Sequence, residues 1–161
     1  MDKIVVSLII CFILYSCTTD REEVTLSGYS YGTHLVSEDK FSLTIELTDN
    51  YTKYILIDDS SREYIAPSFK VPSSTDSIIY SEDVELELVG NKQFQIGDST
   101  YEVLKYEDKE REMTLFFNKL YGPIILRGNH YHGHSTWDRP KRKERQLIDM
   151  IRNDSIDFGG I

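Results

Sequence analysis

The strongest constraint on the fold is a two-residue alternation of apolar and polar side chains that recurs along most of the chain. Phe41, Leu43, Ile45 and Leu47, for example, alternate with serine, threonine and glutamate. Because successive side chains of a β-strand point to opposite faces of the sheet, this spacing predicts strands with one buried and one solvated face. Strands of that kind are typical of antiparallel sheets. The sequence therefore predicts a mainly β domain.

Turn residues between the apolar runs predict an antiparallel meander of eight or nine strands. Gly90-Asn91 suits the turn of a hairpin, and Gly97-Asp98 suits the turn that follows. The charged residues 108–111 predict a solvated connection. In order along the chain, the expected strands are residues 24–31, 41–47, 52–58, 62–71, 84–88, 92–96, 101–107, 112–118 and 122–127.

One α-helix is expected near the C-terminus, at about residues 138–152. Asp138 can cap its start, and Leu147, Ile148 and Ile151 form an apolar stripe. A meander followed by a helix fits an up-and-down barrel or half-barrel, and a two-sheet sandwich nearly as well. This order of elements resembles that of lipocalin-like barrels, although the first strand lacks a Gly-X-Trp motif.

The N-terminus carries the pattern of an export signal. Residues 4–14 form an apolar run of 11 residues, which is too short to cross a bilayer that needs about 20. The next residues, Leu14-Tyr15-Ser16-Cys17, resemble the lipobox of bacterial lipoproteins with a type II signal peptide. This resemblance implies that residues 1–16 are removed, that Cys17 carries diacylglycerol and that acyl chains such as palmitate anchor the protein in a Gram-negative envelope.

Removal of the signal defines the expected domain organisation. It leaves 145 residues of the 161-residue chain, enough for a single domain at residues 24–154. Residues 17–23 are acidic and are expected to form a lipidated tether. They resemble the acidic signal that sends some lipoproteins to the surface of the outer membrane, although an ordinary solvated tether fits equally well. The tail, residues 155–161, is expected to be flexible.

The charge of the chain limits its partners. A net charge of -9 disfavours binding of nucleic acid. Residues 139–145 are the exception, since this segment is strongly basic. It could dock an acidic envelope partner at the start of the expected helix, through Lys141, Arg142, Lys143 and Arg145.

Three of the four histidines lie within five residues, as His130, His132 and His134. In a strand, His130 and His132 would share one face and could chelate a divalent metal as a pair. His134 would be too distant along a straight strand, although Gly133 could bend the chain toward the same ion. A polar loop without metal is the alternative, and the sequence favours it.

Aromatic side chains are the remaining candidates for ligand contact. Tyr29 and Tyr31 alternate on one face, where they could stack on a ligand, line a pocket or simply pack in the core. No Gly-X-Ser-X-Gly, phosphate-binding glycine loop or dinucleotide fingerprint occurs in the chain.

We therefore expect a lipid-anchored binding or accessory protein of the envelope, of unknown ligand, rather than an enzyme. A metal-dependent enzyme or metal-binding protein built on the histidine cluster is one alternative. An interaction protein that docks through the basic segment is the other. Apart from that possible metal, no cofactor is expected.

Overall fold

The computed structural model describes residues 19–30, 34–57, 68–128, 133–138 and 144–154, which form ten strands and one helix. The expected signal peptide, Cys17, and the tail at residues 155–161 lie outside the described residues. The elements are β1 (Thr19–Ser30), β2 (His34–Leu47), β3 (Tyr51–Ile57), β4 (Phe69–Pro72), β5 (Ile78–Ser81), β6 (Val84–Ile96), β7 (Ser99–Asp108), β8 (Met113–Asn118), β9 (Gly122–Gly128), β10 (Gly133–Asp138) and α2 (Glu144–Asn153).

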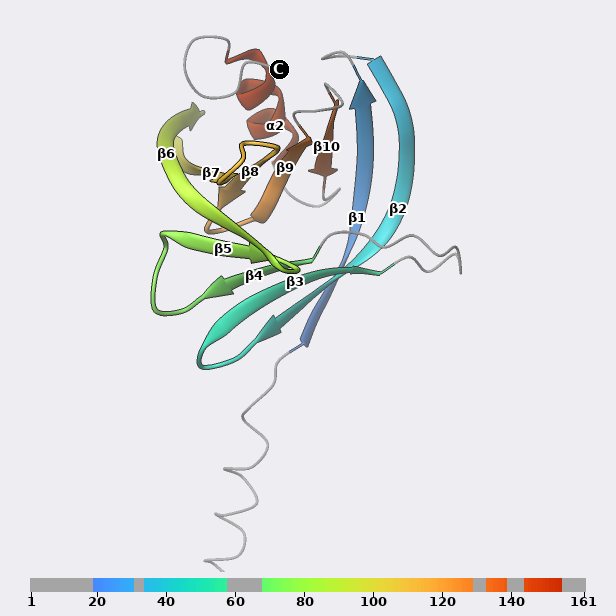
Figure 1. Ribbon diagram of the computed structural model, residues 1–161. Coiled ribbons are helices and arrows are strands. Elements are labelled where there is room, and N and C mark those ends of the chain that lie inside the picture. Colours follow the sequence, from blue (N-terminus) through green and yellow to red (C-terminus); the bar gives the residue numbers. More distant parts are fainter. Residues whose placement is uncertain (1–18, 31–33, 58–67, 129–132, 139–143, 155–161) are drawn as a thin grey trace, which may run out of the picture.

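The ten strands form a closed barrel (Figure 1). Each strand pairs antiparallel with its neighbours in sequence, and β1 also pairs with β10, which joins the two ends of the sheet. The mainly β antiparallel meander with one C-terminal helix is confirmed. The structure also distinguishes between the alternatives, because the sheet closes on itself and forms a barrel rather than a sandwich.

The hairpin expected around Gly90-Asn91 is wrong. β6 runs through these residues as one long strand, and its register with β7 shifts at a β-bulge between Leu88 and Gly90. The real turn lies earlier, at Glu82 (φ 53°), and joins β6 to the short strand β5 that the sequence analysis did not identify. Glycine favours bulges as well as turns, and the long ladder with β7 favours the bulge here.

The other expected connections agree with the structure. Gly97, with φ 60°, turns the chain between β6 and β7. The charged segment at residues 108–111 lies at the connection from β7 to β8, which comprises residues 109–112, and Arg111 has φ 59°. Of the expected strand at residues 62–71, only the end forms β4, since residues 62–67 lie outside the described residues.

Two expected boundaries at the ends of the domain need correction. β1 already begins at Thr19, so residues 19–23 of the expected tether pair with residues 42–46 of β2. The apolar side chains of β2 thereby gain a neighbouring strand. Asp138 does not cap the helix, because it is the last residue of β10 and α2 begins only at Glu144. Burial of the neighbouring Trp137 keeps this segment in the barrel.

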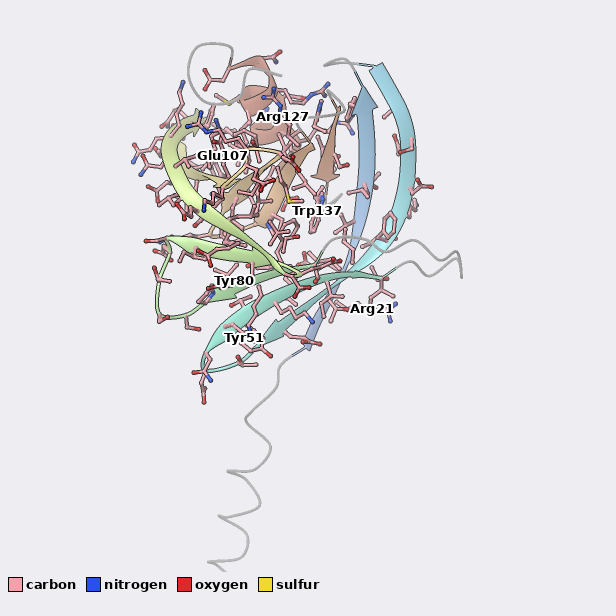
Figure 2. All side chains as sticks on the ribbon, in the orientation of Figure 1. Arg21, Tyr51, Tyr80, Glu107, Arg127 and Trp137 are labelled. Carbon is pink, nitrogen blue, oxygen red and sulfur yellow. The ribbon has the colours of Figure 1, made fainter. Side chains whose placement is uncertain are left out.

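Large apolar side chains fill the interior of the barrel. All ten strands contribute to this inner core, either through its buried residues or through partly buried ones packed against them. Trp137, Phe69 and Tyr106 are at most 1% exposed, and the rings of Trp137 and Phe69 lie 5.4 Å apart. Trp137 is labelled in Figure 2. The buried members of the inner core are Val24, Leu26, Phe41, Leu43, Tyr54, Leu56, Phe69, Ile79, Leu86, Leu104, Tyr106, Leu115, Phe117 and Trp137.

A second, outer core lies between the barrel and α2. Val103 and Leu104 are consecutive in β7 and point to opposite faces, so Leu104 packs inside the barrel while Val103 packs outside. The helix lies against β6, β9 and β10. The outer core comprises Phe94, Val103, Phe116, Tyr121, Ile124, Ile125, Leu147, Ile148 and Ile151. The apolar stripe predicted for the helix is therefore confirmed, with all three residues buried.

Candidate functional site

The register of β1, β10 and β9 brings three polar side chains into one row. His134 of β10 pairs with Tyr29 of β1 on one side and with Arg127 of β9 on the other. Paired residues of an antiparallel ladder project from the same face. That face is the outer one, because Ile125, two residues before Arg127, belongs to the outer core under α2.

Arg152, in the last turn of α2, lies next to this row and contacts Tyr29. Its guanidinium carbon lies 4.1 Å from the centre of the Tyr29 ring. The Tyr29 and His134 rings stack on each other, with centroids 4.9 Å apart and planes only 7° from parallel. We call His134, Tyr29, Arg127 and Arg152 the β10 cluster.

His134 is the unusual member of the β10 cluster. Its side chain is 3% exposed, and neither ring nitrogen has a hydrogen-bond partner. Burial, with the positive charges of Arg152 and Arg127, lowers the pKa of the imidazole to about 4. The ring is therefore neutral near pH 7, with one nitrogen able to donate a hydrogen bond and the other able to accept one.

A buried polar group without a partner is rare enough to need a reason. Among the described residues, His134, Trp137 and Asp154 have such atoms. Asp154 is compensated, because its carboxylate forms an ion pair with Lys92 at 2.7 Å. The remaining two both lie on β10, where Trp137 Nε1 points into the inner core and His134 lies on the outer face.

Buried hydroxyl groups extend the polar row on the same face. Thr136, two residues from His134, pairs with Ser27 of β1, and both are less than 10% exposed. Thr114 of β8 pairs with Arg127 and is 2% exposed. This part of the outer face is thus buried but polar, and the β10 cluster lies at its centre. Such groups can hold and orient a ligand.

The sequence-predicted metal site is only partly described. His130 and His132 lie outside the described residues, whereas His134 is in β10. Over the described residues, no three histidine, cysteine or acidic side chains are grouped as metal ligands would be. The positive charges of Arg127 and Arg152 at His134 also oppose the binding of a cation there. The three-histidine metal site stays a prediction.

The basic segment is also described only at its end. Lys141, Arg142 and Lys143 lie outside the described residues. Arg145 is in α2, with its side chain 76% exposed, and its guanidinium lies 3.2 Å from the Asp138 carboxylate. This contact joins the helix to β10.

A groove of about 380 Å³ forms a second candidate, at the start of β7 and the turn between β8 and β9. Its polar groups already have partners within the protein. Asn118 donates to the Glu102 carbonyl oxygen, and the Lys119 ammonium contacts Asp76, which raises the pKa of Lys119. The groove is lined by Ser99, Thr100, Tyr101, Glu102, Asn118, Lys119 and Leu120. Nothing unsatisfied in it calls for a ligand, so the β10 cluster is the stronger site.

The sequence analysis identified two of the four cluster residues. It singled out His134 for metal binding and Tyr29 as a candidate contact, but it missed Arg127 and Arg152. Both arginines come from elements that the sequence predicted correctly. What it lacked was β10, whose pairing with β1 and β9 creates the row.

Comparison with protein-family models, with curated proteins and with solved structures found no match for the chain. In the described part of the chain, no helix has the length and apolar content needed to span a membrane.

Proposed function

We propose that the chain is a lipid-anchored binding or accessory protein of the Gram-negative envelope, with the β10 cluster as its ligand-contacting site. The observation that carries the binding function is a fully buried histidine, His134, with two unpartnered ring nitrogens beside two arginines. The lipobox ending in Cys17 carries the anchor. We assign the protein to the outer membrane, on the strength of the acidic residues after Cys17.

The filled interior of the barrel supports a site on the outer face. Trp137, Phe69 and Tyr106 occupy the centre, together with eleven other buried residues of the inner core. A ligand inside would have to displace these side chains from a close-packed environment. The outer face at β10 instead carries His134, whose two ring nitrogens lack a hydrogen-bond partner.

Under this proposal, the anchor precedes the start of β1 in the sequence, whereas the β10 cluster lies near the other end of that strand. Cys17 lies two residues before Thr19, where β1 begins, and Tyr29 lies near its other end. Ten residue steps along a strand correspond to about 33 Å. In Figure 1, β1 rises from this end of the barrel toward the end near α2. With Cys17 held in a membrane, the β10 cluster would be directed away from the lipid surface.

The composition of the β10 cluster favours binding over catalysis. It offers a neutral imidazole, a phenol ring and two guanidinium groups, which bind and orient a ligand. Catalytic pairs of the common type instead place a nucleophile within hydrogen-bond reach of a base. Turnover of a substrate that is abolished by replacing His134 would overturn the proposed binding function.

The anchor is tested by metabolic labelling of the full chain with an alkyne analogue of palmitate in a Gram-negative host. The wild type is expected to become labelled and to fractionate with the outer membrane. Cys17→Ser should lose the label, while Cys11→Ser is the matched control and should keep it. Labelling that survives Cys17→Ser, or that is absent from the wild type, would overturn the anchor.

A further inference from the structure

We propose that the β10 cluster binds the carboxylate or phosphate group of a small, soluble molecule. This inference names the ligand class of the binding function proposed above and rests on that function for its place in the envelope. The unpartnered ring nitrogens of His134 and the positive charge of the two arginines beside them support it.

The first argument is the unmet hydrogen-bonding capacity of His134. Its two ring nitrogens have no partner, and the residue is 3% exposed. A buried polar group without a partner destabilises the fold, unless a water molecule or a ligand supplies the missing bond. The hydroxyl groups of Thr136 and Ser27 are buried on the same face, so the His134 ring lies in a polar setting that suits a polar ligand.

The second argument is the sign of the charge at this position. Arg152 and Arg127 both act on His134 with positive charge, although they come from different elements. They take part in other contacts as well, and the inference requires only their field at the imidazole. An approaching oxyanion is attracted by this field and accepts a hydrogen bond from the ring N–H, whereas a cation is repelled. Arginine is also suited to carboxylate and phosphate because of its planar fork of donors.

The flat faces of the cluster are already in contact within the protein. The rings of Tyr29 and His134 stack on each other, and the Arg152 guanidinium lies over Tyr29. A ligand would therefore contact the ring nitrogens of His134 rather than a ring face. Benzoate and inorganic phosphate are suitable probes, because the first carries a carboxylate and the second carries the phosphate charge alone.

The position of the β10 cluster limits the source of the ligand. Lipid head groups also carry phosphate, but the cluster lies about 33 Å along β1 from the strand's anchored end, beyond the depth of the head groups. The overall charge of -9 further disfavours approach to an anionic membrane. A soluble oxyanion is therefore the source that the geometry favours.

The test measures the melting temperature and the binding heat of the full chain with sodium phosphate and with sodium benzoate. Sodium chloride at matched ionic strength corrects for general salt effects. Both probes are expected to raise the melting temperature more than chloride does. Arg152→Gln should weaken binding by about tenfold or more, since it removes a charged hydrogen-bond donor. Arg145→Gln removes an equal charge from an exposed position of the same helix and should leave binding unchanged.

His134→Phe separates binding from folding. Phenylalanine keeps a ring for Tyr29 to stack on and removes both unpartnered nitrogens, so the variant should fold with undiminished stability at pH 7. It should nevertheless lose the response to phosphate and benzoate. A folded His134→Phe protein that binds either probe as the wild type does would overturn the inference.

Three further outcomes would also overturn it. The first is a wild type that responds to phosphate and benzoate no more than to chloride. The second is an equal loss of binding in Arg145→Gln and Arg152→Gln, because that would indicate unspecific attraction. The third is that vesicles of anionic phospholipid bind through the β10 cluster and displace both probes, because that would identify a lipid head group as the ligand. Failure of any kind here would leave palmitate labelling at Cys17 intact, so the ligand class and the anchored function are tested separately.

Discussion

The helix α2 covers two parts of the outer barrel face that differ in chemistry. Over β6 to β9 it packs Leu147, Ile148 and Ile151 onto apolar side chains such as Phe116. Toward β10 and β1 the same face carries His134 and its polar neighbours, with Arg152 above them. Both parts are largely buried. The first part consists of apolar side chains that pack on one another, whereas the second contains His134, a polar ring whose nitrogens have no hydrogen-bond partner.

This difference indicates that burial under one helix serves two purposes. Apolar contacts on the β6 to β9 side attach α2 to the barrel and thereby fix the position of Arg152. The polar side then has a rigid frame, which holds the unpartnered His134 ring in place for the ligand that we propose. Sites supported by packed elements of this kind are more precise than sites on loops. Four predictions examine this division, in order of decreasing expected effect.

The largest effect is expected from the apolar part. Phe116 is fully buried in the outer core, so Phe116→Ala should lower the free energy of unfolding by about 3–5 kcal/mol, through lost burial and the cavity left behind. Urea denaturation followed by circular dichroism measures the loss. Leu120→Ala is the matched control, because Leu120 is 65% exposed and its truncation should change stability by less than about 0.5 kcal/mol. Equal effects of the two substitutions would refute the packing role of the outer core.

The polar part should make stability depend on pH. Folding lowers the pKa of His134 from 6.5 to about 4, so the unfolded chain binds the proton more readily between these values. Protonation of His134 therefore does not reduce stability above pH 6.5, and it lowers the free energy of unfolding as the pH falls from 6.5 to about 4. At about 1.4 kcal/mol per pH unit, the loss amounts to about 3 kcal/mol.

Urea denaturation of the wild type and of His134→Phe across this pH range isolates the effect of His134 protonation, because both proteins contain the same carboxylates. The difference in unfolding free energy between the two should shift in favour of His134→Phe as the pH falls. Parallel pH profiles would contradict the prediction, and would mean that His134 is protonated as readily in the folded protein as in the unfolded chain.

Much of the frame that supports these two parts could be predicted from the sequence, and the reasons are local. Alternation from Phe41 to Leu47 predicted a strand now seen within β2, and the stripe of Leu147, Ile148 and Ile151 predicted the buried face of α2. In each case the pattern depends only on which side chains of one element face the core. The Gly97 turn is equally local, since it needs positive φ.

The β10 cluster could not be predicted in the same way. Residues 130–134, with two nearby glycines, have the composition of a loop, and β10 exists because β1, at the other end of the chain, pairs with it. That pairing sets the neighbours of His134. The contact between Arg152 and Tyr29 likewise depends on how α2 lies on the barrel. Long-range register of this kind leaves no periodic trace in a single sequence.

A smaller effect is expected where the helix meets the polar part. Arg152→Gln removes the cation above Tyr29, and cation–π contacts contribute about 0.5–2 kcal/mol, so the loss of stability should fall in this range. The substitution also removes one of the two positive charges that lower the pKa of His134, which should move that pKa upward. Nitrogen-15 NMR of the imidazole measures the pKa directly. An unchanged pKa in Arg152→Gln would show that Arg152 has no part in setting the protonation of His134.

The smallest effects concern two ion pairs, one at each end of α2. Lys92 and Asp154 join β6 to the residue after α2 at 2.7 Å, with side chains 40% and 12% exposed. Arg145 and Asp138 join the start of α2 to β10 at 3.2 Å, with 76% and 18% exposure. Exposed pairs contribute about 0.2–1 kcal/mol and are screened by salt.

Double-mutant cycles on Lys92→Met with Asp154→Asn, and on Arg145→Gln with Asp138→Asn, measure the two coupling energies. We expect the Lys92–Asp154 pair to be the stronger, because it is shorter and less exposed, and to persist better as sodium chloride is raised. The end of α2 that carries Arg152 would then be held to the apolar side, while its start would be held only weakly to β10. The reverse order would mean that β10 itself fixes the helix, and that the two parts of the outer face are not mechanically distinct.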